Sequence, residues 1–135
     1  MPEKETIERA RQDRLEGKAP STQAGEFVHE EMEHIREGKH GARSTKQAIA
    51  IGLSKARRAG VKLPAPTRGK KSTRESARRD LKKGRQGASR PSARRSRATT
   101  QALRREPRRA ASHEALSRQA RTAARTRRRR TSRRK

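Results

Sequence analysis

The sequence has no cysteine, tryptophan or tyrosine, and Phe27 is its one aromatic residue. Without cysteine the chain can form no disulfide, no cysteine-ligated zinc site and no thiol nucleophile. Without Trp and Tyr it lacks the stacking surfaces on which single-strand binders and RNA-recognition sheets hold bases. No apolar run approaches the ~18–20 residues of a membrane span, and the first residues lack the apolar stretch of a signal peptide. We therefore expect a cytoplasmic protein.

Apolar residues are scarce throughout the chain. They make up 26% of its 135 residues, against about 45–50% in ordinary globular domains. Charged residues make up 40%. Such a chain buries too little apolar surface to offset the entropy of ordering its whole backbone. The composition therefore predicts a mostly disordered protein with one small all-α unit, a helical hairpin.

Positive charge is abundant and unevenly placed. The net charge is +26, and residues 1–63 carry 13 Lys and Arg against 10 Asp and Glu. Residues 64–135 carry the other 27 Lys and Arg against 4 acids, a balance of +23. This asymmetry indicates a polyanionic partner for the C-terminal half, and nucleic acid is the first candidate.

The pattern along the chain predicts three segments. Residues 1–20 form a charged N-terminal segment with a weak helix. Residues 21–63 form the helical hairpin, with helices at about 23–37 and 45–59. Residues 64–135 form a disordered Arg-, Ser- and Ala-rich basic tail, with nascent helix that firms up on a polyanion.

Capping signals bound the two hairpin helices. Ser21 or Thr22 can cap the first helix, and Gly38 stands where it ends. Ser44 opens a capping box for the second helix, which ends at Gly60. The residues expected to pack the hairpin are Val28, Met32, Ile35, Ile49, Gly52, Leu53 and Ala56.

Two residues of the second helix carry further expectations. A mid-helix glycine costs roughly 1 kcal/mol, so Gly52 indicates close approach of another backbone, that of the preceding helix. Ile51 points away from the packed face, which suggests self-association through the hairpin or a partner helix. The N-terminal segment has its own thin apolar stripe of Ile7, Ala10 and Leu15, with Arg11 beside it.

Catalytic and metal-binding patterns are not evident. His29, His34 and His40 are five and six residues apart, so they do not share one helical face as HExxH ligands do. Glutamates recur along one face of the first hairpin helix, and we interpret this glutamate ridge as a solvated face paired with nearby cations. Its members are Glu26, Glu30, Glu33 and Glu37. We expect no enzyme activity, no cofactor and no metal.

The basic tail supplies the candidate nucleic-acid contacts. Arginine contacts to phosphates read backbone and shape rather than base sequence. A helix-turn-helix around Ala48 and Gly52 is disfavoured, because Arg57 and Arg58 stand where its second helix needs an apolar residue. The residues expected to contact nucleic acid are Arg94, Arg95, Arg104, Arg105, Arg108, Arg109, Arg125, Arg127, Arg128, Arg129, Arg130, Arg133, Arg134 and Lys135.

The stretch "EFVHEEMEHIREGKHGARSTKQAIAIGLSKARRAGVKLP" resembles a family of small, basic, functionally uncharacterised bacterial proteins. Their members are labelled DNA-binding or plasmid stabilisation proteins, and the resemblance covers about residues 20–64. The tail is similar only in composition to the tails of linker-histone-like proteins. The resemblance implies DNA as the partner and brings no active site with it.

Together these features predict a non-specific DNA-binding protein, associated with the nucleoid or a plasmid. One alternative is an antitoxin-like or adaptor-like module whose hairpin binds a protein while the tail adds affinity. Another is an RNA- or ribosome-associated protein, because phosphate contacts serve both nucleic acids.

Overall fold

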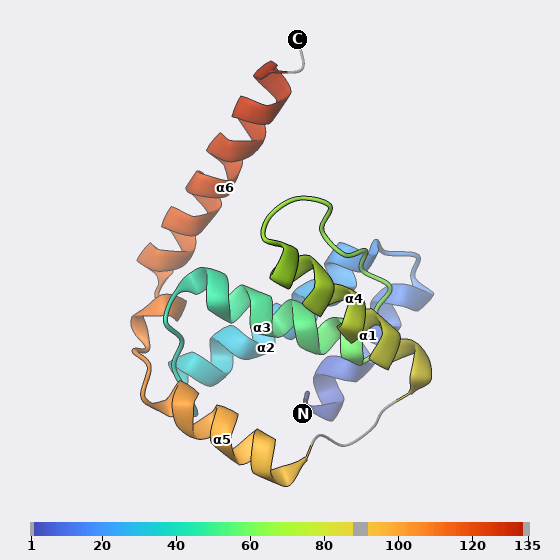
Figure 1. The fold of residues 1–135 in the computed structure, drawn as a ribbon, viewed down its shortest axis with the longest axis vertical. Helices are drawn as coiled ribbons and strands as arrows, with labels where there is room; N and C mark the ends of the chain where they lie inside the picture. The colour runs from blue at the N-terminus through green and yellow to red at the C-terminus, as the bar shows by residue number, and fades with distance from the viewer. Residues whose placement is uncertain (1, 88–91, 134–135) are drawn as a thin grey trace.

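The computed structural model describes residues 2–87 and 92–133, which form a helical body from which one long helix projects (Figure 1). This part of the chain contains six α-helices and one 3₁₀ turn, and no strand. The elements in chain order are α1 (Lys4–Leu15), α2 (Pro20–Arg36), α3 (Thr45–Arg58), α4 (Lys71–Gln86), α5 (Ala93–Arg104), the turn η1 (Arg109–Ala111) and α6 (His113–Arg133).

The prediction of a mostly disordered chain with one helical hairpin is wrong. Helices α2 and α3 do pack on each other, but α1 also lies against α2 and α4 lies against α3. The expectation rested on counting large apolar side chains, whereas small ones carry much of the packing. The buried apolar residues include Ala10, Ala24, Ala42, Ala48, Ala56, Ala77, Ala110 and Ala111.

Helices α2 and α3 make their closest contact at Gly52. A Cβ atom added there would lie 2.7 Å from the Cα atom of Val28. Ordinary carbon–carbon contacts are about 3.5–4.0 Å, so a larger residue at position 52 would push the helices apart. The close backbone approach expected at Gly52 is therefore present, and the partner is α2.

Two apolar clusters lie on either side of this contact. One is formed by Met32, Ile35, Ala42, Ala48, Ala110 and Ala111, with Val28, Ile49 and Leu116 packed against it. The other is formed by Ala10, Ala24, Phe27, Ala56 and Val61, with Leu53 and Leu63 packed against it. The residues expected to pack one hairpin are thus divided between two clusters, which also recruit α1 and the C-terminal half.

Helix ends follow the expected signals in α3 and depart from them in α2. The Ser44 hydroxyl accepts a hydrogen bond from the Gln47 amide at 3.1 Å, and the Gln47 side chain accepts one from the Arg43 amide at 2.6 Å. The reciprocal bond is thus one residue earlier than in a capping box. Helix α2 begins at Pro20 without a side-chain cap. The expected cap at Ser21 or Thr22 is therefore wrong, because proline at the first position already suits a helix start.

Helix α1 is docked on α2, whereas a weak helix was expected here. Thr6 and Ala10 are buried, whereas Ile7 and Leu15 are 40% and 71% exposed. Of the thin apolar stripe, only Ala10 is therefore buried. The small Thr6 and Ala10 side chains allow close contact with α2, and the Glu30 carboxylate accepts a hydrogen bond from the Glu3 amide at 2.6 Å. A carboxylate at this end of α1 is favourable because the helix dipole is positive there.

Helix α4 belongs to the segment expected to be disordered, yet it packs on α3. Asp80 is buried and accepts hydrogen bonds from Arg58 at 2.8 Å and from Ser54 at 2.7 Å. A Cβ atom at Gly84 would lie 2.1 Å from the carbonyl oxygen of Arg57, so the two backbones nearly touch. Asp80 and Gly84 therefore dock α4 on α3, although α4 has almost no large apolar residue.

The C-terminal elements attach to the loop that joins α2 and α3. The Gly41 and Ala42 amides donate to the carbonyls of Leu103 and Pro107 at 2.8 and 3.0 Å. The Thr45 hydroxyl donates to the Ala110 carbonyl at 2.7 Å. These bonds fix η1 and thereby the direction in which α6 leaves the body. In residues 2–87 and 92–133, every helix is too short or too polar to cross a membrane.

Candidate nucleic-acid interface

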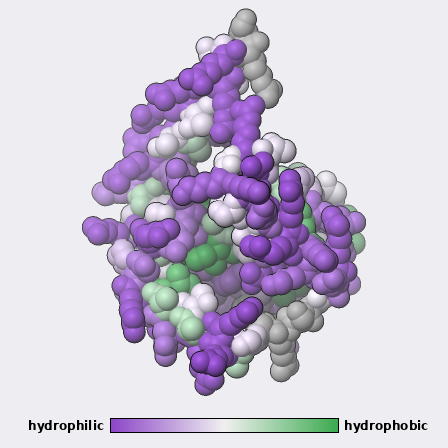
Figure 2. Space-filling view, in the orientation of Figure 1, coloured by the Kyte–Doolittle hydropathy of each residue, from purple (hydrophilic) through white to green (hydrophobic). Residues whose placement is uncertain are grey.

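Helix α6 carries eight arginines and one glutamate, and six of the arginines fall within residues 125–133. It projects away from the body (Figure 1), and none of its residues is buried. Hydrophilic side chains cover it in the face that Figure 2 shows. The exposed arginines of α6 are Arg118, Arg121, Arg125, Arg127, Arg128, Arg129, Arg130 and Arg133.

Beyond the first turns, where Arg118 stands on the same face, four of these arginines share one face of the helix. Arg121, Arg125, Arg128 and Arg129 stand at i, i+4, i+7 and i+8, which places them along a stripe about 100° wide. We call these four residues the arginine stripe. Leu116, at the start of α6, packs against the apolar cluster near η1. The helix is therefore held by its N-terminal turns, and the stripe lies on the part that extends from the body.

Two open grooves beside α6 add further cations. The first, of about 600 Å³, lies between the beginning of α3 and the first turns of α6, and the side chains lining it include Arg43, Lys46, Arg109 and Arg118. One acid, Glu114, also lines it. The second lies between the loop before α4 and the end of α6, and Arg68, Arg127 and Arg130 line it. Both grooves have a cationic lining suited to phosphate groups.

Apart from Arg108 and Arg109, the predicted nucleic-acid contacts fall into three groups. Arg94, Arg95 and Arg104 lie exposed on α5, and Arg105 follows it. Those at positions 125, 127–130 and 133 lie exposed on α6. Arg134 and Lys135 lie outside the described residues.

Arg108 has a different role from the one expected. Its guanidinium donates to the carbonyl oxygens of Ile35, at 3.2 Å, and of Arg36, at the C-terminal end of α2. The Ile35 carbonyl also accepts a hydrogen bond from the Gly38 amide at 3.1 Å, and a cation at this end of α2 suits the helix dipole. Arg108 therefore joins η1 to α2, while its neighbour Arg109 lines the first groove.

Sequence reasoning missed Arg43, Lys46, Arg118 and Arg121. The spacing of Arg118, Arg121 and Arg125 already matched one face of a helix, and that signal could have identified the last two. The first two come next to α6 only through the fold, because the groove is built from segments about 70 positions apart in the chain.

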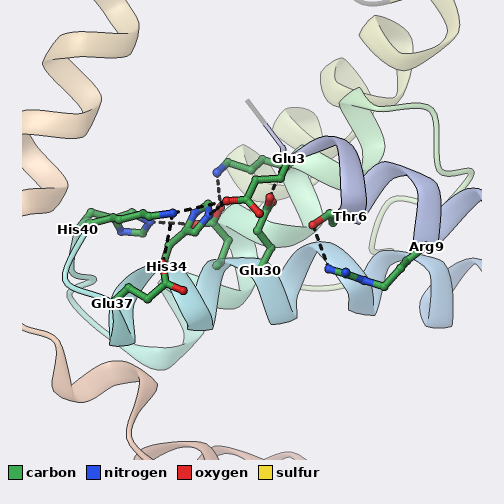
Figure 3. A network of polar contacts seen from close by, with 10 residues as sticks. Glu3, Thr6, Arg9, Glu30, His34, Glu37 and His40 are labelled. Atoms are coloured by element: carbon green, nitrogen blue, oxygen red, sulfur yellow. Dashed lines mark hydrogen bonds and ion pairs between the residues drawn. The ribbon is translucent and has the colours of Figure 1, made fainter.

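Only part of the glutamate ridge is the solvated, ion-paired face that was expected: Glu37 is exposed and pairs with Lys39 at 3.2 Å. Glu30 is buried beneath the start of α1. Glu26 pairs with Arg9 of α1 at 3.1 Å, and Glu33 pairs with Arg36 at 3.1 Å. Part of the ridge is therefore the surface on which α1 docks, which corrects the expectation of a solvated face. Figure 3 shows Glu30 and Glu3 meeting between the two helices.

Two of the histidines come together although their spacing argued against it. The ring centroids of His34 and His40 are 6.2 Å apart, and Figure 3 shows the two residues near each other, with His34 beside Glu3. His40 lies after the end of α2, so helical spacing does not apply to it. The His34 ring forms a hydrogen bond with Glu3 at 3.2 Å, and this bond lowers the pKa of the Glu3 carboxyl. His29 remains exposed on α2.

One protein-family model matches residues 4–71, which span α1, α2, α3 and the connection to α4. The chain belongs to the DUF6496 family. DUF6496 is described as a family of unknown function, so it assigns no ligand, reaction or partner. No curated protein and no solved structure matches the chain significantly.

The DUF6496 match ends at the first residue of α4. It includes the stretch whose resemblance suggested DNA-binding or plasmid stabilisation proteins, but its description carries neither label. The arginine stripe and all of the predicted nucleic-acid contacts lie beyond the matched residues. A function for this surface therefore has to be argued from its geometry and charge.

Proposed function

We propose that the protein binds double-stranded DNA without marked sequence preference, with α6 in the major groove. The observation that carries this proposal is the arginine stripe on a helix that projects from the body. The two grooves beside α6, one at its first turns and one at its end, would hold the flanking phosphates. The proposal keeps the basic C-terminal half as the binding element and replaces a disordered tail with ordered helices.

The dimensions of α6 suit a duplex. A helix of 21 residues is about 31 Å long and about 10–12 Å wide. The major groove of B-DNA is about 12 Å wide, and one turn of the duplex is about 34 Å long. Helix α6 can therefore lie along about one turn of DNA while its arginines reach phosphates on both sides of the groove.

Helix geometry also favours DNA over RNA. The major groove of A-form RNA is deep and narrow, so side chains cannot read it and a helix does not enter it easily. Sequence-specific RNA recognition relies on aromatic stacking of unpaired bases, and the chain has no Trp or Tyr. RNA binding is thus the outcome that the test below has to exclude.

Fluorescence anisotropy with the full-length protein tests this function. Labelled duplex DNA of random sequence, A/T-rich duplex DNA and duplex RNA are titrated at several salt concentrations. If about ten phosphates are neutralised on DNA, log K falls with log salt with a slope near −9. The affinities for the two DNA duplexes should agree within about tenfold. A sequence-specific protein binds its own site about 10³–10⁷ times more tightly than non-specific DNA.

Other results would point to the alternatives. Tighter binding to duplex RNA would indicate an RNA- or ribosome-associated protein. A slope near −2, which corresponds to about two phosphates, would indicate that the basic helices only assist a protein interaction. If the proposal holds, the resemblance to bacterial proteins makes the nucleoid or a plasmid the DNA that is bound.

A further inference from the structure

The loop after α2 brings a histidine back to the helix that it leaves. Gly38 ends α2 with φ of 81°, a backbone conformation that favours glycine, and the Lys39 amide donates to the His34 carbonyl at 3.0 Å. The chain thereby reverses direction. The His40 side chain, 11% exposed, comes to lie with Nε2 at 3.1 Å from Oε2 of Glu31, whose side chain is 1% exposed.

The backbone determines which nitrogen of His40 carries the proton. Nδ1 lies 2.9 Å from the carbonyl oxygen of Gly41. A carbonyl oxygen only accepts hydrogen bonds, so Nδ1 carries hydrogen and Nε2 of the neutral ring has a lone pair. That lone pair faces a carboxylate oxygen. Two acceptors at this distance repel each other unless a cation lies between them.

Three buried carboxylate oxygens lack a hydrogen-bond donor in the part of the chain that the structure describes. They are Oδ2 of Asp13, Oε2 of Glu30 and Oε2 of Glu31, and only the last lies beside His40. Leaving such an atom buried and unsatisfied is costly. Lys55 binds the other oxygen of Glu31, Oε1. Oε2 of Glu31 is therefore the oxygen that remains free to bind a cation beside His40.

His34 and Glu3 complete the surroundings. Ligand atoms of Glu31, His34 and His40 all lie within 4.8 Å of one another, and so do those of Glu3, Glu30 and His34. Zinc holds nitrogen and oxygen ligands at about 2.0–2.2 Å, so the ligand atoms have to close in by about 1 Å around an ion. A histidine that donates its other ring nitrogen to a backbone carbonyl, as His40 does, is the usual form of a metal ligand.

We propose that Glu31, His34 and His40 form a binding site for one divalent transition-metal ion such as Zn²⁺. Two imidazoles with a carboxylate select zinc, cobalt or nickel over magnesium and calcium, which take oxygen ligands. Glu3 supplies a further carboxylate beside His34. The proposal concerns the chain without nucleic acid and does not depend on DNA binding.

The site lies where the C-terminal half attaches to the body. His40 directly precedes Gly41 and Ala42, whose amides hold the chain on both sides of Glu106. An ion that fixes His40 onto α2 therefore also fixes the loop that carries α5, η1 and α6. Metal occupancy should slow hydrogen exchange at the amides of this loop as well as at those of α2.

Isothermal titration of the full-length protein with Zn²⁺ tests the site. Wild type should bind one equivalent, and Co²⁺ at the same site should show visible absorption bands that Zn²⁺ removes. His40→Gln, and separately Glu31→Gln, should weaken binding by about 10–100-fold or more, since loss even of an outer partner has that effect. The matched control is His29→Gln, which removes an exposed histidine from α2 and should leave the affinity for Zn²⁺ unchanged.

Three results would overturn the proposal. The first is the absence of saturable one-to-one Zn²⁺ binding by wild type, a result that does not depend on whether any variant folds. The second is unchanged affinity in His40→Gln with the helicity of wild type. The third is an equal loss of affinity in His29→Gln.

Discussion

A matched pair of glycine-to-alanine substitutions tests how closely α2 and α3 pack. Gly25 lies inside α2 and Gly52 inside α3, so alanine gains about 1 kcal/mol of helix propensity at either position. At Gly25 an added Cβ has no neighbour within 4 Å in the described structure, whereas at Gly52 it lies 2.7 Å from Val28 Cα and 3.0 Å from Val28 Cγ2. The helices have to separate by about 1 Å at Gly52, an overpacking cost of about 1–3 kcal/mol.

The difference between the two variants isolates the packing term, because the propensity gain cancels. Gly25→Ala should be more stable than wild type, and Gly52→Ala should be about 1–3 kcal/mol less stable than Gly25→Ala. For a chain of this length that difference corresponds to about 4–10 °C in Tm. Thermal and urea unfolding followed by circular dichroism measure it. Equal stabilisation by both substitutions would refute the close α2–α3 contact.

Three further predictions concern single side chains. Asp80→Asn should lower the free energy of unfolding by about 1–2 kcal/mol, because its bonds to α3 become weaker. The control is Glu75→Gln, which changes an exposed acid on the same helix and should have little effect. Equal effects of the two variants in urea unfolding would contradict docking of α4 by Asp80. Ser44→Ala should cost about 1 kcal/mol through loss of the α3 cap, and an unchanged unfolding midpoint would contradict the cap. Bonding to Asp13 raises the pKa of Lys18 above 10.5, so its stabilisation is complete below that value and is lost as pH rises through the raised pKa. Melts of wild type and Lys18→Gln should therefore differ at neutral pH and converge at strongly alkaline pH.

The sequence predicts the local signals of α3 and of the end of α2 well, but not the start of α2. The cap at Ser44, the helix ends at Gly38 and Gly60, and the close approach at Gly52 all rest on single residues whose backbone chemistry depends little on context. These features belong to near neighbours in the chain. They do not reveal that the two helices are the centre of a larger helical body.

The parts that sequence reasoning missed depend on distant partners. In the sequence Asp80 is one acid among basic residues, and only the fold places Arg58 and Ser54 of α3 beside it. In the sequence His40 is a histidine in a loop, and only the reversal of the chain at Gly38 places it beside Glu31. In both cases a polar side chain, rather than a large apolar one, fixes the arrangement. A rule that counts apolar side chains therefore predicts disorder where the structure has docked helices.

The salt dependence of DNA binding by two variants of equal charge tests the central proposal most directly. One variant replaces the four residues of the arginine stripe by glutamine. The other replaces four exposed cations of the body by glutamine, and these are Lys4, Arg11, Arg14 and Lys62. If the stripe contacts four phosphates, its variant should have a log K against log salt slope shallower than wild type by about 3–4. The body variant should keep the wild-type slope, and the same change of slope in both variants would contradict binding through α6.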